Sequence, residues 1–153
     1  MDRFMQAAVE EAEKGILSDE GGPFGSVVVK DGEIVGRGHN QVVLLKDPTC
    51  HGEMQAIRNA CRRLGTFDLS GCVLYTTGEP CQMCLTACLW ARLDKVYYGC
   101  TIADNAAIGF RDQKFDELFS GRDKLGDYLQ ELDRDACLQL FARYNGLKKK
   151  TNY

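Results

Sequence analysis

The chain has 153 residues, of which 44% are hydrophobic and 27% charged, and it carries a formal net charge of −3. This composition is typical of one soluble globular domain that buries a core without disulfide staples, so 1–153 is taken as a single domain. No apolar run approaches the roughly 20 residues of a membrane span, and no secretory signal is visible, so we expect a cytoplasmic protein without a membrane partner. The acidic balance also argues against a nucleic-acid partner, because cationic contacts to phosphate supply most non-specific affinity.

The first part of the chain predicts a helix, a hairpin and a second helix. Gly15 is the expected end of the first helix and Gly65 that of the second, because glycine favours the position after a helix C-terminus. Asp31 and Gly32 form a strong two-residue hairpin signal. The predicted bounds are a helix over 1–14, strands over 24–30 and 33–38, and a helix over 51–64.

The second part alternates strands with helices and then becomes helical. Pro80 stands in the first turn of one predicted helix, and Asp133 is a candidate N-cap for the last. An order of αββαβαβ followed by helices predicts an α/β layered fold whose first two strands are antiparallel. The predicted bounds are strands over 72–77 and 94–100 and helices over 80–91, 112–119 and 134–147.

Eight cysteines are present, and we expect them to be reduced, because disulfide frameworks belong to small secreted chains with poor cores. Four of them, Cys61, Cys72, Cys100 and Cys137, stand in apolar patterns and are interpreted as core residues. Cys81 and Cys84 are different, because they belong to a motif.

Two short motifs carry the chemistry: His51-Gly52-Glu53 and Pro80-Cys81-Gln82-Met83-Cys84. Each begins a predicted helix, where unpaired N–H groups stabilise thiolate and disfavour imidazolium. Zinc needs deprotonated cysteine and neutral histidine, and one histidine with two cysteines leaves a fourth tetrahedral position for water. A carboxylate beside that water, here Glu53, can carry its proton, so we expect a catalytic site with one zinc ion per chain.

Two other interpretations of these residues were weighed. A Cys-x-x-Cys pair at a strand-to-helix junction also fits a redox dithiol, although this leaves His51 and Glu53 unexplained. A purely structural zinc site would need a fourth protein ligand, for which Cys88 and Cys50 are candidates.

The combination of H-x-E with P-C-x-x-C is the signature of zinc nucleobase deaminases. Residues 24–110 resemble the cytidine-deaminase-like superfamily, most closely its guanine and tRNA adenosine deaminase branches. This resemblance implies a three-layer α/β/α sandwich around a five-stranded mixed sheet, with zinc between the two motif helices and a homodimer or larger assembly. The stretches that carry it are Gly22-Pro23-Phe24-Gly25, Gly38-His39-Asn40, Pro48-Thr49-Cys50-His51-Gly52-Glu53 and Glu79-Pro80-Cys81-Gln82-Met83-Cys84.

Two later segments resemble bacterial guanine deaminases. Ala107–Asp112 is similar to a segment that leads to an active-site aspartate, here Asp112, and the lysine-rich tail similarly closes on a terminal tyrosine, Tyr153. The resemblance makes the C-terminal helix and tail, about 133–153, a possible lid or an element exchanged between subunits.

The same resemblance implies substrate-binding roles for Asn40, Phe24 and Trp90. Asn40 would hydrogen-bond the base, Phe24 and His51 would flank its ring, and Trp90 would line the pocket. Each role has a plainer alternative: a turn residue for Asn40, core packing for the two aromatic residues, a helix N-cap for Asp112 and a frayed end for Tyr153. His39 is given no role.

The function expected from this resemblance is hydrolytic deamination of a free purine base, with guanine converted to xanthine and ammonia. Gly52 departs from the commoner His-Ala-Glu form and is similar to cytosine deaminases instead, and Gln82 and Arg111 depart as well. Adenosine deamination in tRNA and deamination of cytosine or a nucleoside are therefore alternatives within the enzyme class. A catalytically silent zinc-binding interaction module is the alternative outside it.

Overall fold

The computed structural model describes residues 2–121, 125–126, 128–148 and 151. The chain divides into two compact units, residues 1–115 and 116–153. The elements in chain order are α1 (Arg3–Leu17), β1 (Gly25–Lys30), β2 (Glu33–His39), α2 (Val42–Leu45), α3 (Gly52–Leu64), β3 (Cys72–Gly78), α4 (Gln82–Trp90), β4 (Lys95–Cys100), α5 (Ile102–Ala107), α6 (Asp112–Phe119) and α7 (Arg134–Asn145).

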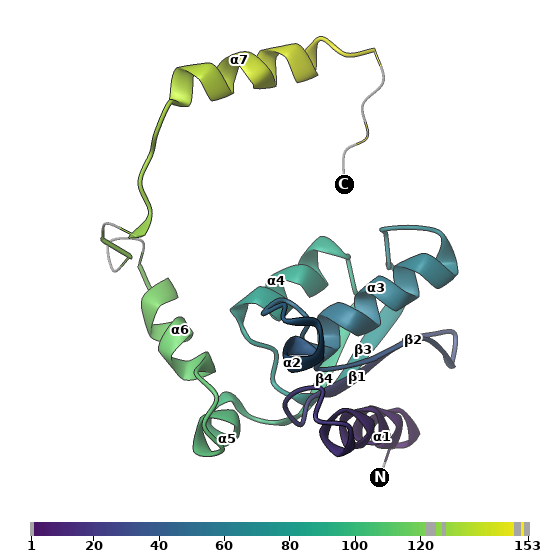
Figure 1. Cartoon of the computed structure of the whole chain (residues 1–153). Helices are drawn as coiled ribbons and strands as arrows, with labels where there is room; N and C mark the ends of the chain where they lie inside the picture. Colours follow the sequence, from purple (N-terminus) through teal and green to yellow (C-terminus); the bar gives the residue numbers. More distant parts are fainter. Residues whose placement is uncertain (1, 122–124, 127, 149–150, 152–153) are drawn as a thin grey trace. The chain divides into compact units, whose positions relative to one another are not determined.

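The first unit is built on a four-stranded mixed sheet in the order β2-β1-β3-β4. β1 pairs antiparallel with β2 and with β3, and β3 pairs parallel with β4. α1 covers one face of this sheet, and α3 and α4 cover the other (Figure 1). The α/β layering is as predicted, but the five-stranded sheet is not. Among the described residues, every element after Cys100 is a helix, so no fifth strand pairs with β4.

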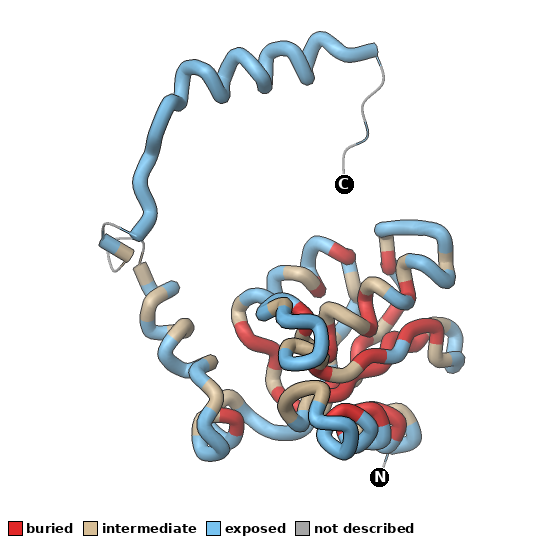
Figure 2. Tube along the Cα trace, in the orientation of Figure 1, coloured by how far each residue is buried: buried red, intermediate tan, exposed pale blue. Residues whose placement is uncertain are grey.

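The hairpin between β1 and β2 and the burial of β1 both follow from the sequence. Asp31 and Gly32 have φ values of 50° and 78°, the left-handed pair that a tight two-residue hairpin turn requires. Val27 and Val29 pack towards α1, while Val28 packs into the core beneath α3. An unbroken valine run suits a strand that is covered on both faces, and Figure 2 shows the buried residues concentrated in these central strands.

Small residues let α3 lie close against β2. Gly36 and Gly38 stand two apart on the strand, so both face the helix. A methyl group added to Gly36 would come within 2.8 Å of the Ala60 Cβ, and one added to Gly38 within 2.7 Å of the Gly52 carbonyl oxygen. Because this packing fixes the distance between sheet and helix, it also fixes where α3 begins.

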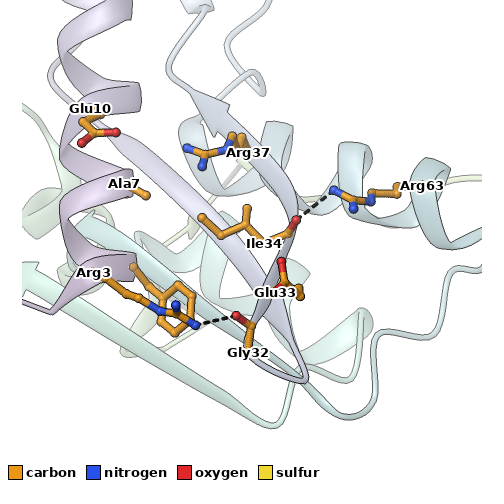
Figure 3. Close-up of a pocket in the computed structure, with 9 residues that line it drawn as sticks. Arg3, Ala7, Glu10, Gly32, Glu33, Ile34, Arg37 and Arg63 are labelled. Atoms are coloured by element: carbon orange, nitrogen blue, oxygen red, sulfur yellow. Dashed lines mark hydrogen bonds between the residues drawn. The ribbon is translucent and has the colours of Figure 1, made fainter.

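Side chains are hydrogen-bonded to the β2 edge of the sheet, whereas the β4 edge is mostly exposed. Along β2, the outward carbonyl of Gly32 accepts a hydrogen bond from Arg3 at 2.8 Å, and that of Ile34 accepts one from Arg63 at 2.9 Å (Figure 3). The Arg37 carbonyl accepts another from Asn59 at 2.8 Å. Charged and amide side chains therefore occupy an edge that could otherwise pair with a further strand. β4, at the opposite edge, is mostly exposed.

Several predictions of detail were wrong. α1 does not end at Gly15 but continues to Leu17, and Gly15 is buried against the ring of His39, where a Cβ would come within 2.8 Å of the ring. Cys72 is buried and Cys61 packs against the core, as predicted, whereas Cys100 and Cys137 are exposed. Cys100 ends the exposed edge strand, which explains its exposure.

The helices of the second part follow the predicted pattern more closely than their caps do. α6 has the predicted bounds, and α7 begins at the predicted residue. Asp133 does precede α7, but it has a φ of 52° and makes no capping hydrogen bond through its side chain. The short helices α2 and α5 were not predicted. Within the described ranges, no helix is long and apolar enough to cross a membrane.

Candidate metal centre

The candidate centre lies where two helices begin. His51 is the N-cap residue of α3 and Cys81 that of α4, both with extended backbone. Neither side chain caps its own helix. Both instead point at each other, with Cys84 from the first turn of α4 completing the group.

The three ligand atoms have the spacing that zinc requires. His51 Nδ1 lies 3.6 Å from Cys81 Sγ and 3.5 Å from Cys84 Sγ, and all three atoms lie within 4.8 Å of one another. Typical zinc–nitrogen and zinc–sulfur bond lengths at a tetrahedral angle place these atoms about 3.6 Å apart. The donor set and its spacing therefore both fit a zinc ion.

A fourth protein ligand is absent from the group. Among the described residues, the cluster that could hold a metal contains His51, Cys81 and Cys84 alone. Cys88 belongs to the core beside Leu74, and burial raises the pKa of its thiol to about 12. Cys50 is buried and accepts a hydrogen bond from Arg58 at 3.5 Å. The two candidates for a structural fourth ligand are thus occupied elsewhere, as a catalytic site requires.

The two cysteines share one proton between them. Hydrogen bonds from Cys84 and His51 lower the pKa of the Cys81 thiol to about 4, and they outweigh its burial. The pKa of Cys84 is raised, because its proton is held by the Cys81 thiolate and because it is buried. The hydrogen bond to Cys81 likewise raises the pKa of His51. A divalent cation would displace the shared proton, since metal binding requires both thiolates.

Glu53 lies in the first turn of α3, directly beside the cluster. Its side chain is buried, with 5% exposed, and is hydrogen-bonded to Cys84. Burial raises the pKa of its carboxyl group above the ordinary value. A buried carboxyl with a raised pKa can both accept and release a proton near neutral pH, which is the property of a general acid–base group.

Asn40 and Phe24 are brought to the same region. The Asn40 backbone N–H donates to the Phe24 carbonyl at 2.8 Å, and the Asn40 side chain is buried. The Phe24 carbonyl in turn faces Gly52, where a Cβ would come within 2.8 Å of it. The Phe24 ring meets Phe110 edge to face, with the centroids 4.7 Å apart. Phe24 thus packs directly against the residue that follows His51, and Asn40 is hydrogen-bonded to Phe24.

Asp112 also acts on the cluster, because its charge is one of those that raise the pKa of His51. It is the first residue of α6, and its Oδ2 accepts a hydrogen bond from Asn105 Nδ2 at 3.2 Å. Asn105 is 2% exposed and also donates to the Glu79 carbonyl at 3.4 Å. Sequence reasoning missed Asn105, which lies on the unpredicted helix α5.

One expected substrate residue is exposed, and another lies outside the described residues. Trp90 is the last residue of α4, two turns from Cys84, and is 63% exposed, so the structure does not place it in a pocket with the zinc ligands. Tyr153 lies outside the described residues. A separate cavity of about 530 Å³, between α1 and the β2 edge, is lined by Arg3, Arg37 and Arg63 among others and shares no residue with the cluster (Figure 3).

Comparison with known proteins points to deaminases with different substrates. Residues 1–100 match the family described as the cytidine and deoxycytidylate deaminase zinc-binding region. Guanine deaminase from Bacillus subtilis (strain 168) is 48% identical over 111 residues, which are 72% of this chain and 71% of that protein. A tRNA-specific adenosine deaminase from Streptococcus pyogenes serotype M18 is 38% identical over 153 residues, covering 97% of this chain and 94% of that protein.

Solved structures give the same picture. The X-ray structure of guanine deaminase from Bacillus subtilis matches with a TM-score of 0.89 at 38% identity and covers 100% of both chains. A structure of guanine deaminase from Nitrosomonas europaea matches with a TM-score of 0.67 at 32% identity, covering 70% of this chain and 62% of the other.

Proposed function

The chain belongs to the cytidine and deoxycytidylate deaminase zinc-binding family and binds one zinc ion as a zinc-dependent hydrolase, and from this we propose that it is a guanine deaminase. The reaction is guanine plus water giving xanthine plus ammonia. The observation that carries the proposal is the likeness to Bacillus subtilis guanine deaminase over the full length of both chains, at a TM-score of 0.89. The His51, Cys81 and Cys84 cluster beside buried Glu53 supplies the chemistry.

His51 Nδ1 and the Sγ atoms of Cys81 and Cys84 would hold the metal. When bound, zinc supplies a Lewis acid that makes water nucleophilic near neutral pH. Glu53 transfers protons between the attacking water and the base. Its carboxylate takes one proton from the attacking water and delivers it to the ring nitrogen beside the attacked carbon, C2. It then takes the second proton of that water, now on the oxygen bonded to C2, and passes it to the amino group, which departs as ammonia and leaves a C2 carbonyl. The raised pKa of the Glu53 carboxyl supports this role, because the group must hold the proton between steps.

Binding of the base is assigned to Asn40, Phe24 and Asp112. Asn40 Oδ1 is engaged by the Val42 N–H at 3.1 Å, while its Nδ2 donates to none of the described residues, so it is free to donate to an acceptor on the base. Phe24 offers an aromatic edge beside the cluster, held by Phe110. The Asp112 carboxylate can accept hydrogen bonds from the N–H groups of guanine, which adenine does not offer in the same arrangement.

Adenosine deamination in tRNA is the second candidate, and a specific observation favours it. The Streptococcus pyogenes tRNA-specific adenosine deaminase covers 97% of this chain, a larger share than the guanine deaminase sequence match. The net charge of −3 argues against a polyanionic substrate.

We also propose a homodimer, with exchange of the C-terminal segment 133–153 as its possible form. α4 is mostly apolar but buries only Cys84 and Cys88, leaving Leu89 70% exposed. A helix of this kind normally has a partner on each side. Light scattering of the purified protein, with and without residues 133–153, tests both statements. We propose a cytoplasmic location as well, which is consistent with eight free cysteines, and a part in purine breakdown, which rests on the proposed reaction alone.

Ammonia release is the decisive measurement. Zinc-loaded protein is incubated separately with guanine, adenine, cytosine, nucleosides and an adenosine-bearing anticodon stem-loop, and xanthine is followed in parallel by its ultraviolet absorbance. Guanine is expected to turn over fastest. Faster turnover of the stem-loop would transfer the assignment to tRNA, and faster turnover of cytosine would transfer it to a pyrimidine.

A further inference from the structure

One carboxylate oxygen holds the side chains on both sides of Asn40. Glu20 Oε2 lies 2.7 Å from His39 Nε2 and accepts a hydrogen bond from Gln41 Nε2 at 2.8 Å. The side chains of His39 and Gln41 therefore both reach Glu20, and Gly21, which follows Glu20, lies directly against the Oδ1 of the Asn40 side chain. Glu20 therefore holds the residues immediately before and after Asn40.

The two residues that contact Glu20, His39 and Gln41, are themselves bound to side chains of α1 and α3. On one side, His39 Nδ1 lies 3.4 Å from Glu11 Oε2, and Glu11 is a buried residue of α1. On the other side, Gln41 Oε1 accepts a hydrogen bond from Gln55 Nε2, in α3, at 2.6 Å. The Gln41 backbone N–H also donates to the Cys50 carbonyl at 2.9 Å, next to the zinc ligand His51. The position of Asn40 is thus tied to the helix that begins at the metal centre.

The packing around this network is close. A Cβ on Gly21 would come within 2.6 Å of the Asn40 carbonyl oxygen, and one on Gly15 within 2.8 Å of the His39 ring. The segment that carries Glu20 therefore lies directly on residues 39–40, and α1 makes room for the imidazole. Hydrogen bonds from Gln41 and His39 lower the pKa of the Glu20 carboxyl group, so it is ionised at neutral pH.

We propose that Glu20, His39 and Gln41 form a brace that fixes the direction of the Asn40 amide, which makes Glu20 a positioning residue for base recognition. The inference rests on the proposed function, because it takes Asn40 as the residue that meets the base. The brace holds the residues before and after Asn40, while the Val42 N–H donates to Oδ1 and Gly21 packs against it. Nδ2 donates to none of the described residues, which leaves its N–H groups for the base. An amide fixed before binding loses less conformational freedom when the base arrives, so the brace lowers KM.

The test compares Glu20→Ala with Glu20→Gln and with a matched control, Glu10→Ala. Glu10 is an exposed α1 residue whose side chain accepts a hydrogen bond from Gln6 at 3.3 Å and has no link to Asn40. Freeing one side chain is expected to raise KM for guanine about fivefold in Glu20→Ala, with kcat changed far less. Glu20→Gln keeps one acceptor oxygen and should recover part of the loss, while zinc content stays near one per chain in all variants.

A double-mutant cycle with Asn40→Ala separates positioning from plain stability. If Glu20 acts through Asn40, Glu20→Ala has little further effect on guanine affinity once Asn40 is alanine. Guanine affinity is also measured by calorimetry in the Glu53→Gln background, which binds the base without turning it over. Unchanged KM in Glu20→Ala, or an effect that adds fully to that of Asn40→Ala, would overturn the brace.

Failure of the proposed function would look different. In that case the unmodified enzyme would release no ammonia from guanine. The brace would then be judged by crystal structures of the unmodified and Glu20→Ala proteins. A displaced Asn40 side chain in the variant supports it, and an Asn40 side chain unchanged in position and order overturns it.

Discussion

Substitution of Gly38 by alanine is expected to destabilise the first unit and to disturb the metal centre together. The added methyl group would lie 2.6 Å from the Gln55 Cβ and 2.7 Å from the Gly52 carbonyl oxygen, and closer still to the Ala56 nitrogen. Two of these three atoms belong to the backbone of α3, which cannot swing aside as a flexible side chain can. Ordinary contact would require the start of α3 to retreat from β2 by about 1 Å.

Two opposing effects set the size of the loss. Overpacking of this kind costs roughly 1–3 kcal/mol. Replacing glycine by alanine at a backbone conformation that alanine tolerates recovers about 0.4–1 kcal/mol through the unfolded state. The net loss is therefore about 1–2 kcal/mol, which lowers Tm by roughly 3–8 °C in a chain of this length.

Urea and thermal unfolding of the zinc-loaded protein measure this loss, and competition with a chelator measures zinc affinity, which should fall because His51 precedes the displaced turn. Gly146→Ala is the control, since Gly146 has a φ of −77° and a Cβ there would meet nothing closer than 3.4 Å. It should unfold at the same temperature as the unmodified protein or slightly higher. If Gly38→Ala is as stable as this control, the close approach of α3 to β2 does not limit stability and the reasoning is wrong.

The remaining predictions concern the metal, the proton carrier and a loop carboxylate. Replacing both Cys81 and Cys84 by alanine should abolish stoichiometric zinc in metal analysis, and zinc that persists near one per chain would refute the ligand assignment. Glu53→Gln should keep zinc and fold yet lose about 10²–10⁴-fold or more in kcat, whereas turnover within a few-fold of normal would make Glu53 structural. Hydrogen bonds from Ser70 and then from Arg92 lower the pKa of Asp68 from 3.8 to about 2. Asp68 therefore stabilises the fold above pH 4 and loses this contribution as pH falls towards 2, so urea midpoints of Asp68→Asn should lie below normal at pH 7 and converge with it near pH 2. A gap of the same size at both pH values would contradict this.

The parts of the fold that the sequence predicted are those that local chemistry specifies. The Asp31-Gly32 turn, the Gly65 helix end and the helix starts at His51 and Cys81 depend on a few adjacent residues, and the ligand set follows from them. The prediction that α1 ends at Gly15 was wrong, because this glycine makes room for the ring of His39, which stands 24 positions later in the chain. Long-range packing of this kind leaves no periodic signal.

The site residues divide in the same way. Glu53 and the ligands could be predicted because their spacing along the chain determines their geometry. Asn105 and the carboxylate of Glu20 could not, because each acts through hydrogen bonds to segments that neither periodicity nor turn chemistry links to it. The fifth strand was expected from resemblance alone, without a strand pattern in the residues after Cys100 to support it.

The unequal edges of the sheet limit how copies of this protein can join. A β-sheet that is open on both sides can recruit one copy after another, and the result is a fibre. Among the described residues, Arg3, Arg63 and Asn59 donate to three carbonyl groups on the β2 side, so this side is less open to a further strand than the β4 side. A single open edge strand permits a dimer in which β4 pairs with β4 about a twofold axis. Such a dimer has no open edge strand left to which a further copy could pair. The side chains that cover the β2 edge thus disfavour the growth of an extended sheet from that edge.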